Sequence, residues 1–322
     1  MSKIRFAFYF FAIMAITFAC STCVFASSAQ TWVSGVGSDS NQCTRTAPCL
    51  TLAGALAQTS NGGVITALDP GDFGTIPSPG IQQSVTIEGN GIAKIDVPSG
   101  GTGIPVDVGP AQTVVLRGLH IGGAGGGLIG IDDTSTGGTL YVENCTISNF
   151  ANYGIHFAPT QDASLFVTDS TIDGNIASSV TAAPFPSAIA LMQASTKFTP
   201  NVSIDRTKMQ GYQYGLYVGG QVQAAVSNSV ISGNLSHGVR DEKTFTNLVS
   251  IWQCMIANNG GSGIALNNSK ATVLITYNTI VNNAAGLTFA STSSGSIVSL
   301  GSNSIIENNG KGADPSTTQS LR

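Results

Sequence analysis

Four side chains with the chemistry of a proton-transfer site occur at one position of a repeated strand pattern. Asp132, His156, Tyr217 and Arg240 each follow a glycine and an aliphatic residue. If the repeats stack, equivalent side chains on adjacent strands lie ~5 Å apart. His156 or Tyr217 can then act as a base that removes the proton beside a carboxyl group, while Arg240 neutralises the carboxylate. The predicted outward column is Asp132, His156, Ala190, Tyr217, Arg240, Ala265 and Thr288.

The strands that must position these residues belong to a repeat of about 25 residues. Each of nine repeats has one aliphatic anchor, with further apolar residues five and seven positions before it. This alternation is typical of a short strand with one buried side. A second strand, which begins with glycine and an aliphatic residue, follows most anchors. The anchors are Ile92, Ile121, Ile147, Ile172, Met209, Ile231, Ile256, Ile280 and Ile305.

Strand, turn, strand and turn at this period predict an all-β solenoid of about nine coils. A leucine-rich repeat would need a Leu-x-x-Leu-x-Leu signature and a helix in each unit, and the sequence has neither. Asparagines three residues after five anchors are expected to stack as amides and to allow sharp turns. They are Asn175, Asn234, Asn259, Asn283 and Asn308.

The stacked columns resemble the right-handed parallel β-helix superfamily that includes pectate lyases and polygalacturonases. The resemblance implies a single-stranded right-handed parallel β-helix over residues 64–310, and it is not specific for activity. The segment from Gly238 to Thr244 looks like the Gly-x-Arg-Ile-Lys strand of polygalacturonases, whose Arg and Lys hold the substrate carboxylate. By this likeness Arg240 and Lys243 are candidate substrate-binding residues, and Tyr217 is a third because it lines the expected groove beside Arg240.

The likeness to polygalacturonases does not extend to their catalytic acids. One coil before Arg240 that family has Gly-His-Gly, whereas this chain has Gln213-Tyr214-Gly215, and Ala190 and His156 replace two aspartates. Inverting hydrolysis needs two carboxylates ~6.5 to 9.5 Å apart, so hydrolysis is not expected. Ca²⁺ would be a cofactor only if the protein is a lyase. Apart from Asp132-Asp133 the sequence has no carboxylate cluster, and we predict no cofactor.

One repeat of 37 residues adds a loop beside the candidate column. About nine extra residues lie between Asn175 and Ala188 and include Pro184-Phe185-Pro186. Long loops in compact folds are usually functional or disordered. We therefore expect the loop to form the wall of a groove beside His156 and Tyr217.

Two further outward columns lie on the first strand of consecutive repeats. Opposite charges at Glu88, Arg117 and Glu143 predict a ladder of ion pairs worth a few tenths of a kcal/mol each, about the usual size for exposed pairs. The other column is apolar and can either stack on sugar rings or lie under a covering loop. It consists of Val115, Tyr141 and Phe166.

Asp241 occupies a position that is apolar in other repeats, and burial of an unpaired carboxylate would be costly. Either the strand ends early and Asp241 turns outward, or it pairs with Arg240 or Lys243. We favour an ion pair at the strand end.

The first residues are typical of a secretory signal. Lys3 and Arg5 precede an apolar run from Phe6 to Ala19, and small residues suited to cleavage follow. Residues 1–26, or 1–29, are therefore predicted to be a signal peptide, with a lipoprotein site at Cys20 as the competing interpretation. No later segment is apolar enough to span a bilayer. The expected location is secreted, whether periplasmic, cell-surface or extracellular.

The rest of the chain divides into three parts. Residues 27–63 form an N-terminal segment with a capping helix near 51–58, which Thr51 can cap and Asn61-Gly62-Gly63 can stop. Residues 64–310 form the β-helix, and residues 311–322 a loose polar tail.

Cysteines and histidines indicate one disulfide and no metal site. Export would place Cys43 and Cys49 in an oxidising compartment, where we expect them to pair. Cys145 and Cys254 share a column four coils apart, ~19 Å at the usual strand spacing, so they are expected to stay reduced. The histidines fall in different columns and do not have the spacing of a zinc site. They are His120, His156 and His237.

Charge excludes some partners and leaves a glycan as the expected one. Loss of Lys3 and Arg5 leaves 11 basic against 17 acidic residues, which argues against nucleic acid or an anionic membrane. The leading prediction is an exported protein that binds a polysaccharide or cell-surface glycan or has a structural role, without a demonstrable catalytic constellation. The alternative is a polysaccharide lyase or uronate epimerase that acts in a groove lined by His156, Tyr217 and Arg240. The oligomeric state stays open.

Overall fold

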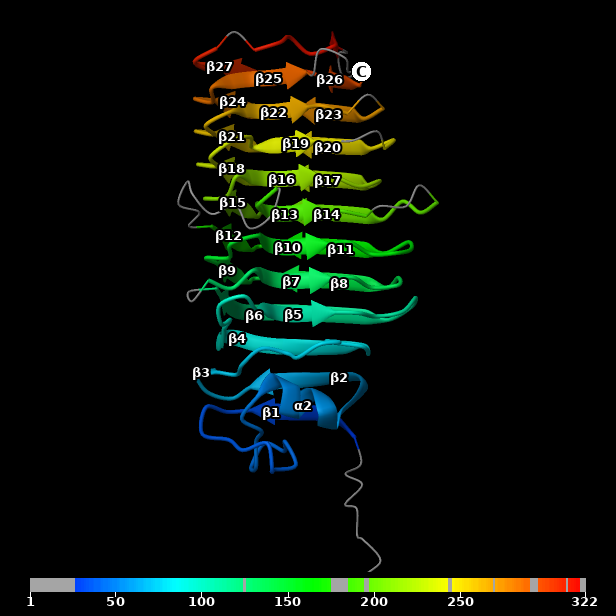
Figure 1. Ribbon diagram of the computed structural model, residues 1–322, viewed down its shortest axis with the longest axis vertical. Helices are drawn as coiled ribbons and strands as arrows, with labels where there is room; N and C mark the ends of the chain where they lie inside the picture. Colours follow the sequence, from blue (N-terminus) through cyan, green and yellow to red (C-terminus); the bar gives the residue numbers. More distant parts are fainter. Residues whose placement is uncertain are drawn as a thin grey trace, which may run out of the picture.

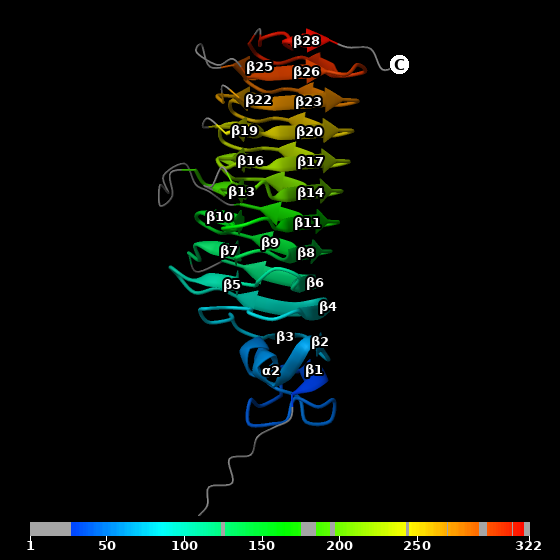
Figure 2. The same cartoon turned by 90° about the vertical axis from the view of Figure 1, so that its right-hand side faces the viewer.

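The computed structural model describes residues 27–123, 126–174, 185–193, 197–242, 245–268, 270–289, 295–310 and 312–318. They form a right-handed parallel β-helix of about nine coils with one short helix. Figures 1 and 2 show the strands stacked along one long axis, from the N-terminal end in blue to the C-terminal end in red. The predicted fold class is confirmed. The predicted signal at residues 1–26 lies outside the described residues.

Each coil contributes strands to three faces, which we number in chain order. Face 1 carries β1 Ser28–Val33, β2 Thr59–Ala67, β4 Val85–Asp96, β6 Thr113–Gly122, β8 Thr139–Glu143, β11 Ser164–Thr168, β14 Asn201–Asp205, β17 Gln223–Ser227, β20 Leu248–Trp252, β23 Thr272–Thr276, β26 Ser296–Ser299 and β28 Thr317–Thr318.

Faces 2 and 3 follow face 1 within each coil. Face 2 carries the second halves of β4 and β6 and the short strands β3 Gly71–Asp72, β9 Thr146–Ser148, β12 Thr171–Asp173, β15 Lys208–Gln210, β18 Val230–Ser232, β21 Met255–Ala257, β24 Thr279–Val281 and β27 Ser304–Ile306. Face 3 is a separate sheet of β5 Thr102–Val106, β7 Ile129–Asp133, β10 Tyr153–Phe157, β13 Ser187–Leu191, β16 Tyr214–Val218, β19 Val239–Asp241, β22 Ser262–Leu266 and β25 Ala285–Phe289.

The core consists of inward aliphatic residues in register from coil to coil. On face 1, Leu116 pairs with Val142, Val142 with Val167, and Val167 with Ile204. All four side chains are buried. Because the alternation within a strand has a period of two, each strand places its β-branched residues inside and its polar residues outside.

The glycine at the second position of most face 3 strands has a steric cause. A Cβ at Gly154 would lie 2.3 Å from Cγ2 of Ile172, and one at Gly215 would lie 2.3 Å from Cγ2 of Ile231. The face 2 isoleucine therefore packs against the bare backbone of face 3. This contact explains why glycine recurs at the start of the second strand in the repeat.

One predicted anchor, and one residue predicted to point inward seven positions before an anchor, are out of register. In the first coils Ile95, not Ile92, pairs with Ile121, because a bulge lies between Glu88 and Ala93. In the last coil the buried residue next to Val273 is Ile297, and Val298 pairs with Leu274 on the outside. Both errors arise where extra residues within one coil shift the spacing, inside β4 in the first case and between β26 and β27 in the second, and counting along the chain does not detect them.

A ladder of buried amides forms the turn between faces 2 and 3, as predicted. Nδ2 of Asn234 donates to Oδ1 of Asn259 at 2.9 Å, and the same bond recurs from Asn259 to Asn283 at 2.9 Å and from Asn283 to Asn308 at 3.1 Å. Each Oδ1 also accepts the backbone N–H of the asparagine before it. The amides thus satisfy backbone groups that the sharp turn leaves unpaired. Asn175 lies outside the described residues.

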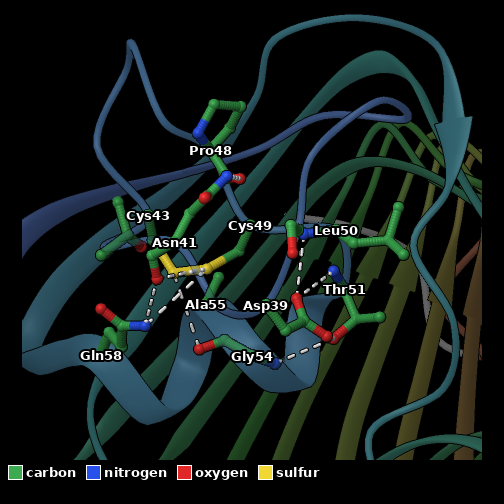
Figure 3. The surroundings of a disulfide bond; sticks show 12 residues. Asp39, Asn41, Cys43, Pro48, Cys49, Leu50, Thr51, Gly54, Ala55 and Gln58 are labelled. Carbon is green, nitrogen blue, oxygen red and sulfur yellow. Dashed lines mark hydrogen bonds between the residues drawn. A yellow bond between two sulfur atoms is a disulfide. The ribbon is translucent and has the colours of Figure 1, made fainter.

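The N-terminal end is closed by a disulfide loop, and the parallel sheet begins before Val64. Strand β1 already pairs in parallel with β2. Its free edge is covered by the loop around the Cys43–Cys49 disulfide, since Trp32 N–H donates to Cys43 O and Cys49 N–H donates to Trp32 O. This pairing hides an edge that would otherwise invite aggregation. Figure 3 shows the disulfide above the adjacent helix.

Helix α2, Leu52–Gln58, confirms the predicted short helix. Thr51 caps it by accepting the N–H of Gly54, and Asp39 holds the cap through the N–H groups of Leu50 and Thr51 (Figure 3). The helix does not run to the predicted stop at Asn61-Gly62-Gly63, because β2 starts directly at Thr59 and passes through those residues.

The C-terminal segment is not a loose tail over its described part. Strand β28 pairs with β26, and Ala313 N–H donates to Leu287 O on face 3. Residues 312–318 therefore close two of the three open edges of the last coil. Among the described residues no helix has the length and apolarity to cross a bilayer.

Loss of the disulfide should weaken the N-terminal closure. The double variant Cys43→Ser/Cys49→Ser is expected to lower the free energy of unfolding by about 2 kcal/mol, because the unfolded chain gains the freedom of an open loop. Urea titration measures the change. Reductant should lower the midpoint of the parent protein and leave the double variant unchanged; equal midpoints for parent and variant would contradict the assigned role.

The amide ladder should be most sensitive in its middle. Asn259→Ala removes four side-chain hydrogen bonds, those with the Asn234 backbone N–H, Asn234 Nδ2, Ile231 O and Asn283 Oδ1. It leaves the buried backbone N–H of Asn234 without its acceptor, so a loss of about 2 to 4 kcal/mol is expected. Asn308→Ala is the matched control at the partly exposed end, where water replaces the amide and the loss should be smaller. Thermal and urea unfolding of both variants would test the order, and a larger loss at Asn308 would refute it.

Candidate functional site

The predicted outward column lies on face 3 in the expected order. Parallel pairing places Asp132 beside His156, His156 beside Ala190, and Ala190 beside Tyr217. Tyr217 in turn pairs with Arg240. The column continues through Ala265 and Thr288. The roles proposed for these side chains therefore depend on what each one contacts.

Asp132 and His156 form a pair at one end of the column. His156 Nδ1 lies 2.8 Å from Asp132 Oδ1, and the side chains are 19% and 25% exposed. The imidazole stacks on Tyr153, with ring centroids 4.9 Å apart. The pair is oriented and reaches solvent, but Ala190 separates it from Tyr217. The column is thus two separate clusters.

Tyr217 does not line an open groove as expected, because it is fully buried. Phe185 from the long loop stacks on its ring at a centroid distance of 4.5 Å, and Tyr214 lies 5.7 Å away. Burial raises the pKa of the Tyr217 phenol far above its usual range, and the adjacent Glu242 acts in the same direction. The phenol therefore stays protonated at neutral pH and does not suit the predicted role of base.

Arg240 is engaged by protein groups. Its Nη2 donates to Glu242 Oε1 at 3.0 Å and its Nη1 donates to Tyr214 Oη at 3.0 Å. Glu242 also accepts a bond from Tyr217 Oη at 3.3 Å. The guanidinium charge is already balanced within the protein. The third candidate for substrate binding, Lys243, lies outside the described residues.

Sequence reasoning missed Tyr214, Glu242 and His237 in this cluster. Tyr214 and His237 stack with centroids 5.9 Å apart, and His237 Nδ1 accepts the N–H of Ser262. Burial, with help from nearby Arg240, lowers the pKa of His237 to about 4, so the ring is neutral. Glu242 stands two residues after Arg240, and that spacing on a strand was the one available signal for the pair.

Asp241 is an inward residue, and the expected ion pair with Arg240 is wrong. Its carboxyl is 1% exposed and accepts bonds from Nδ2 of Asn247 at 3.1 Å and from Nδ2 of Asn268 at 3.0 Å. Burial raises the pKa of Asp241 to about 7. Two neutral amides from the following turns therefore pair with the buried carboxyl, where the sequence had predicted a cation. Asp133, in the same inward column, is also buried, which raises its pKa to about 6.

Face 1 carries the other predicted outward columns. Arg117 bonds to Glu143 at 2.7 Å and to Glu88 at 3.1 Å, which confirms the charged ladder. Tyr141 and Phe166 are stacked, with centroids 4.8 Å apart and planes 11° apart, so each ring covers one face of the other. Both rings are partly exposed.

The free side of Phe166 borders a depression of about 260 Å³, which we call the Phe166 slot. It forms because the next outward residues in the column, Ser203, Ala225 and Ser250, are small. Asn201 and Gln223 line one side of it. Within the described chain, the side chains of Asn201, Gln223 and the two serines have no hydrogen-bond partner. The slot is therefore an open, uncharged cleft with one aromatic wall.

The described side chains do not form a recognisable metal site. No group of three His, Cys, Asp or Glu residues in the described chain could hold an ion. Cys145 and Cys254 are free and buried, as predicted, and their thiols donate to backbone carbonyls. Burial raises the pKa of both thiols to about 11, which disfavours the thiolate that metals bind.

The strand order and register define a right-handed parallel β-helix, which is the architecture of the pectate lyases. Among solved structures the chain is similar to pectate lyase Pel9A, with a TM-score of 0.62 and 15% identity over 92% of this chain and 81% of that one. It is also similar to the mannuronan C-5 epimerase AlgE4 A-module of Azotobacter vinelandii, with a TM-score of 0.44 and 12% identity over 76% of this chain and 80% of that one. The first likeness establishes the fold alone.

Residues 83–319 match the family described as periplasmic copper-binding protein (NosD), and the chain belongs to this family. It is accordingly a secreted or periplasmic protein, as the sequence had indicated. No curated protein matches the sequence significantly.

Asp241 should make stability depend on pH in a predictable direction. Its pKa is raised in the folded state, so its stabilising contribution is complete below its unfolded pKa near 4 and is lost as the pH rises through about 7. Asp241→Asn keeps the shape and removes this loss. As the pH rises from 5 to 8, the free energy of unfolding of the variant should increase by about 2 to 3 kcal/mol relative to that of the parent.

Urea titrations at both pH values measure this difference, and Asp133 contributes equally to parent and variant. A constant difference between Asp241→Asn and the parent at the two pH values would show that Asp241 is not the titrating group.

Proposed function

We propose that this protein binds glycans on face 1 without cleaving them. The observation that carries the proposal is the Phe166 slot, which combines one free aromatic face with four uncommitted polar side chains. A mostly apolar surface with a few convergent polar groups is the usual composition of a small-molecule site. A sugar ring matches it, because a pyranose has apolar C–H faces and a rim of hydroxyl groups.

The lyase or epimerase alternative on face 3 has weaker support. That chemistry needs a base and a cation free to neutralise the substrate carboxylate. Arg240 is paired with Glu242, and Tyr217 is buried and protonated. His156 is the one candidate base that reaches solvent, and the guanidinium lies three strands away. We therefore place the function in binding.

The family description names copper, and the described residues do not fit that ion. His156 is held by Asp132, and His237 accepts a backbone N–H through Nδ1. The two thiols lie four strands apart, ~19 Å at the usual strand spacing, and both are buried. A copper site needs several N or S donors around one point. The glycan binding that we propose does not require a metal.

Removal of the aromatic wall should weaken glycan binding. Phe166→Ala is expected to raise the Kd about tenfold, equivalent to ~1.4 kcal/mol of lost stacking and apolar contact. Val115→Ala, in the same outward column on the far side of Tyr141, is the matched control and should bind like the parent. Calorimetry with the oligosaccharide that binds best in a glycan screen measures both. Unchanged affinity in Phe166→Ala would refute the proposal.

A further inference from the structure

We infer that the Phe166 slot takes a single uncharged sugar ring, either neutral or N-acetylated, from a chain end or branch. This inference rests on the glycan-binding function proposed above and specifies its ligand class. It separates this protein from a binder of polyuronates.

The surroundings of the slot do not favour a negatively charged ligand. None of the lining residues is charged. The nearest carboxylate on the same strand is Asp205, two residues after Ser203. It bonds to Arg206, Ser227 and Asn228, and Arg206 is shared with Asp169. A sugar carboxylate in the slot would lose water without gaining a cation among the lining residues, and Asp205 would repel it.

The polar side chains of the slot suit hydroxyl and acetamido groups. Asn201 and Gln223 each offer an amide donor and an amide acceptor, and Ser203 and Ser250 each offer a hydroxyl that does both. Such groups bond equally well to sugar hydroxyls and to the N–H and C=O of an acetamido group. They do not distinguish a carboxylate as a guanidinium would.

The orientation of the Tyr141 and Phe166 rings limits how a glycan can stack in the slot. Tyr141 covers one face of Phe166, so a ligand can stack only on the face towards Ser203. A ring stacked there stands across the sheet, in the space left by Ser203 and Ala225. A polymer extended along the solenoid axis would instead meet ring edges. The volume of about 260 Å³ lies just below the ~300 Å³ at which drug-sized sites begin, which suits one ring.

The test compares ligand classes by saturation-transfer NMR on the full protein. The probes are neutral hexose oligomers, N-acetylhexosamine oligomers and oligouronates, each at low and high salt. We expect a neutral or N-acetylated oligomer to bind, with transfer concentrated on its terminal ring and less than a twofold change in Kd between the two salt concentrations. Oligouronates should bind at least tenfold more weakly.

A slot-filling variant locates the binding. Ala225→Leu should raise the Kd for the best oligomer at least tenfold, while Val298→Leu adds bulk in the same column beyond the slot and should leave it unchanged. Circular dichroism and the unfolding midpoint check that both variants fold. If Ala225→Leu does not fold, Ser203→Thr provides a milder filling with the same expected direction.

The outcomes separate the two proposals. Preferred, salt-sensitive binding of oligouronates that Ala225→Leu weakens, or equal transfer to internal rings, would overturn the ligand class and leave glycan binding at the slot standing. Binding that Ala225→Leu does not weaken would overturn the slot. Absence of binding to all three classes would overturn the proposed function itself.

Discussion

The structure depends on parallel register between coils, because every inward side chain must lie on its equivalent in the coil before. The aliphatic columns through Leu116, Val142 and Val167 meet this condition on face 1. The Asn234–Asn308 amide ladder meets it at the turn, where each amide completes the hydrogen bonds of its neighbour. A solenoid is stable only while neighbouring coils agree, so its interior and its corners repeat together.

The same register decides which polar residues are free to act. Arg240, Tyr217 and Glu242 look like a catalytic group when placed in a column, yet they bond to one another beneath Phe185. Asp241 is buried and held by amides from the next turns. Burial of these groups is tolerable because each has at least one polar partner, although Arg240 Nε has none. The described polar side chains that line the Phe166 slot, by contrast, are uncharged and have no hydrogen-bond partner in the described chain.

The two ends of the solenoid cover their open strand edges in different ways. A coil with no neighbour exposes strand edges, which attract other strands. At the start, the loop around the Cys43–Cys49 disulfide bonds to β1. At the end, residues 312–318 pair with β26 and β25. Neither closure repeats a neighbour, so the period of the sequence could not predict either one.

The sequence by itself determined the fold class, the coil repeat, the order of the Asp132 to Thr288 column, the amide ladder and the disulfide. All but the disulfide follow from spacing, because strands that repeat at one period stack in register, and the disulfide follows from two cysteines close together in an exported chain. Only the tertiary structure decided that Phe185 covers Tyr217, that amides hold Asp241, and that Ile95 replaces Ile92 as an anchor. Loop paths and bulges depend on contacts between segments distant in the chain, and periodicity does not encode them.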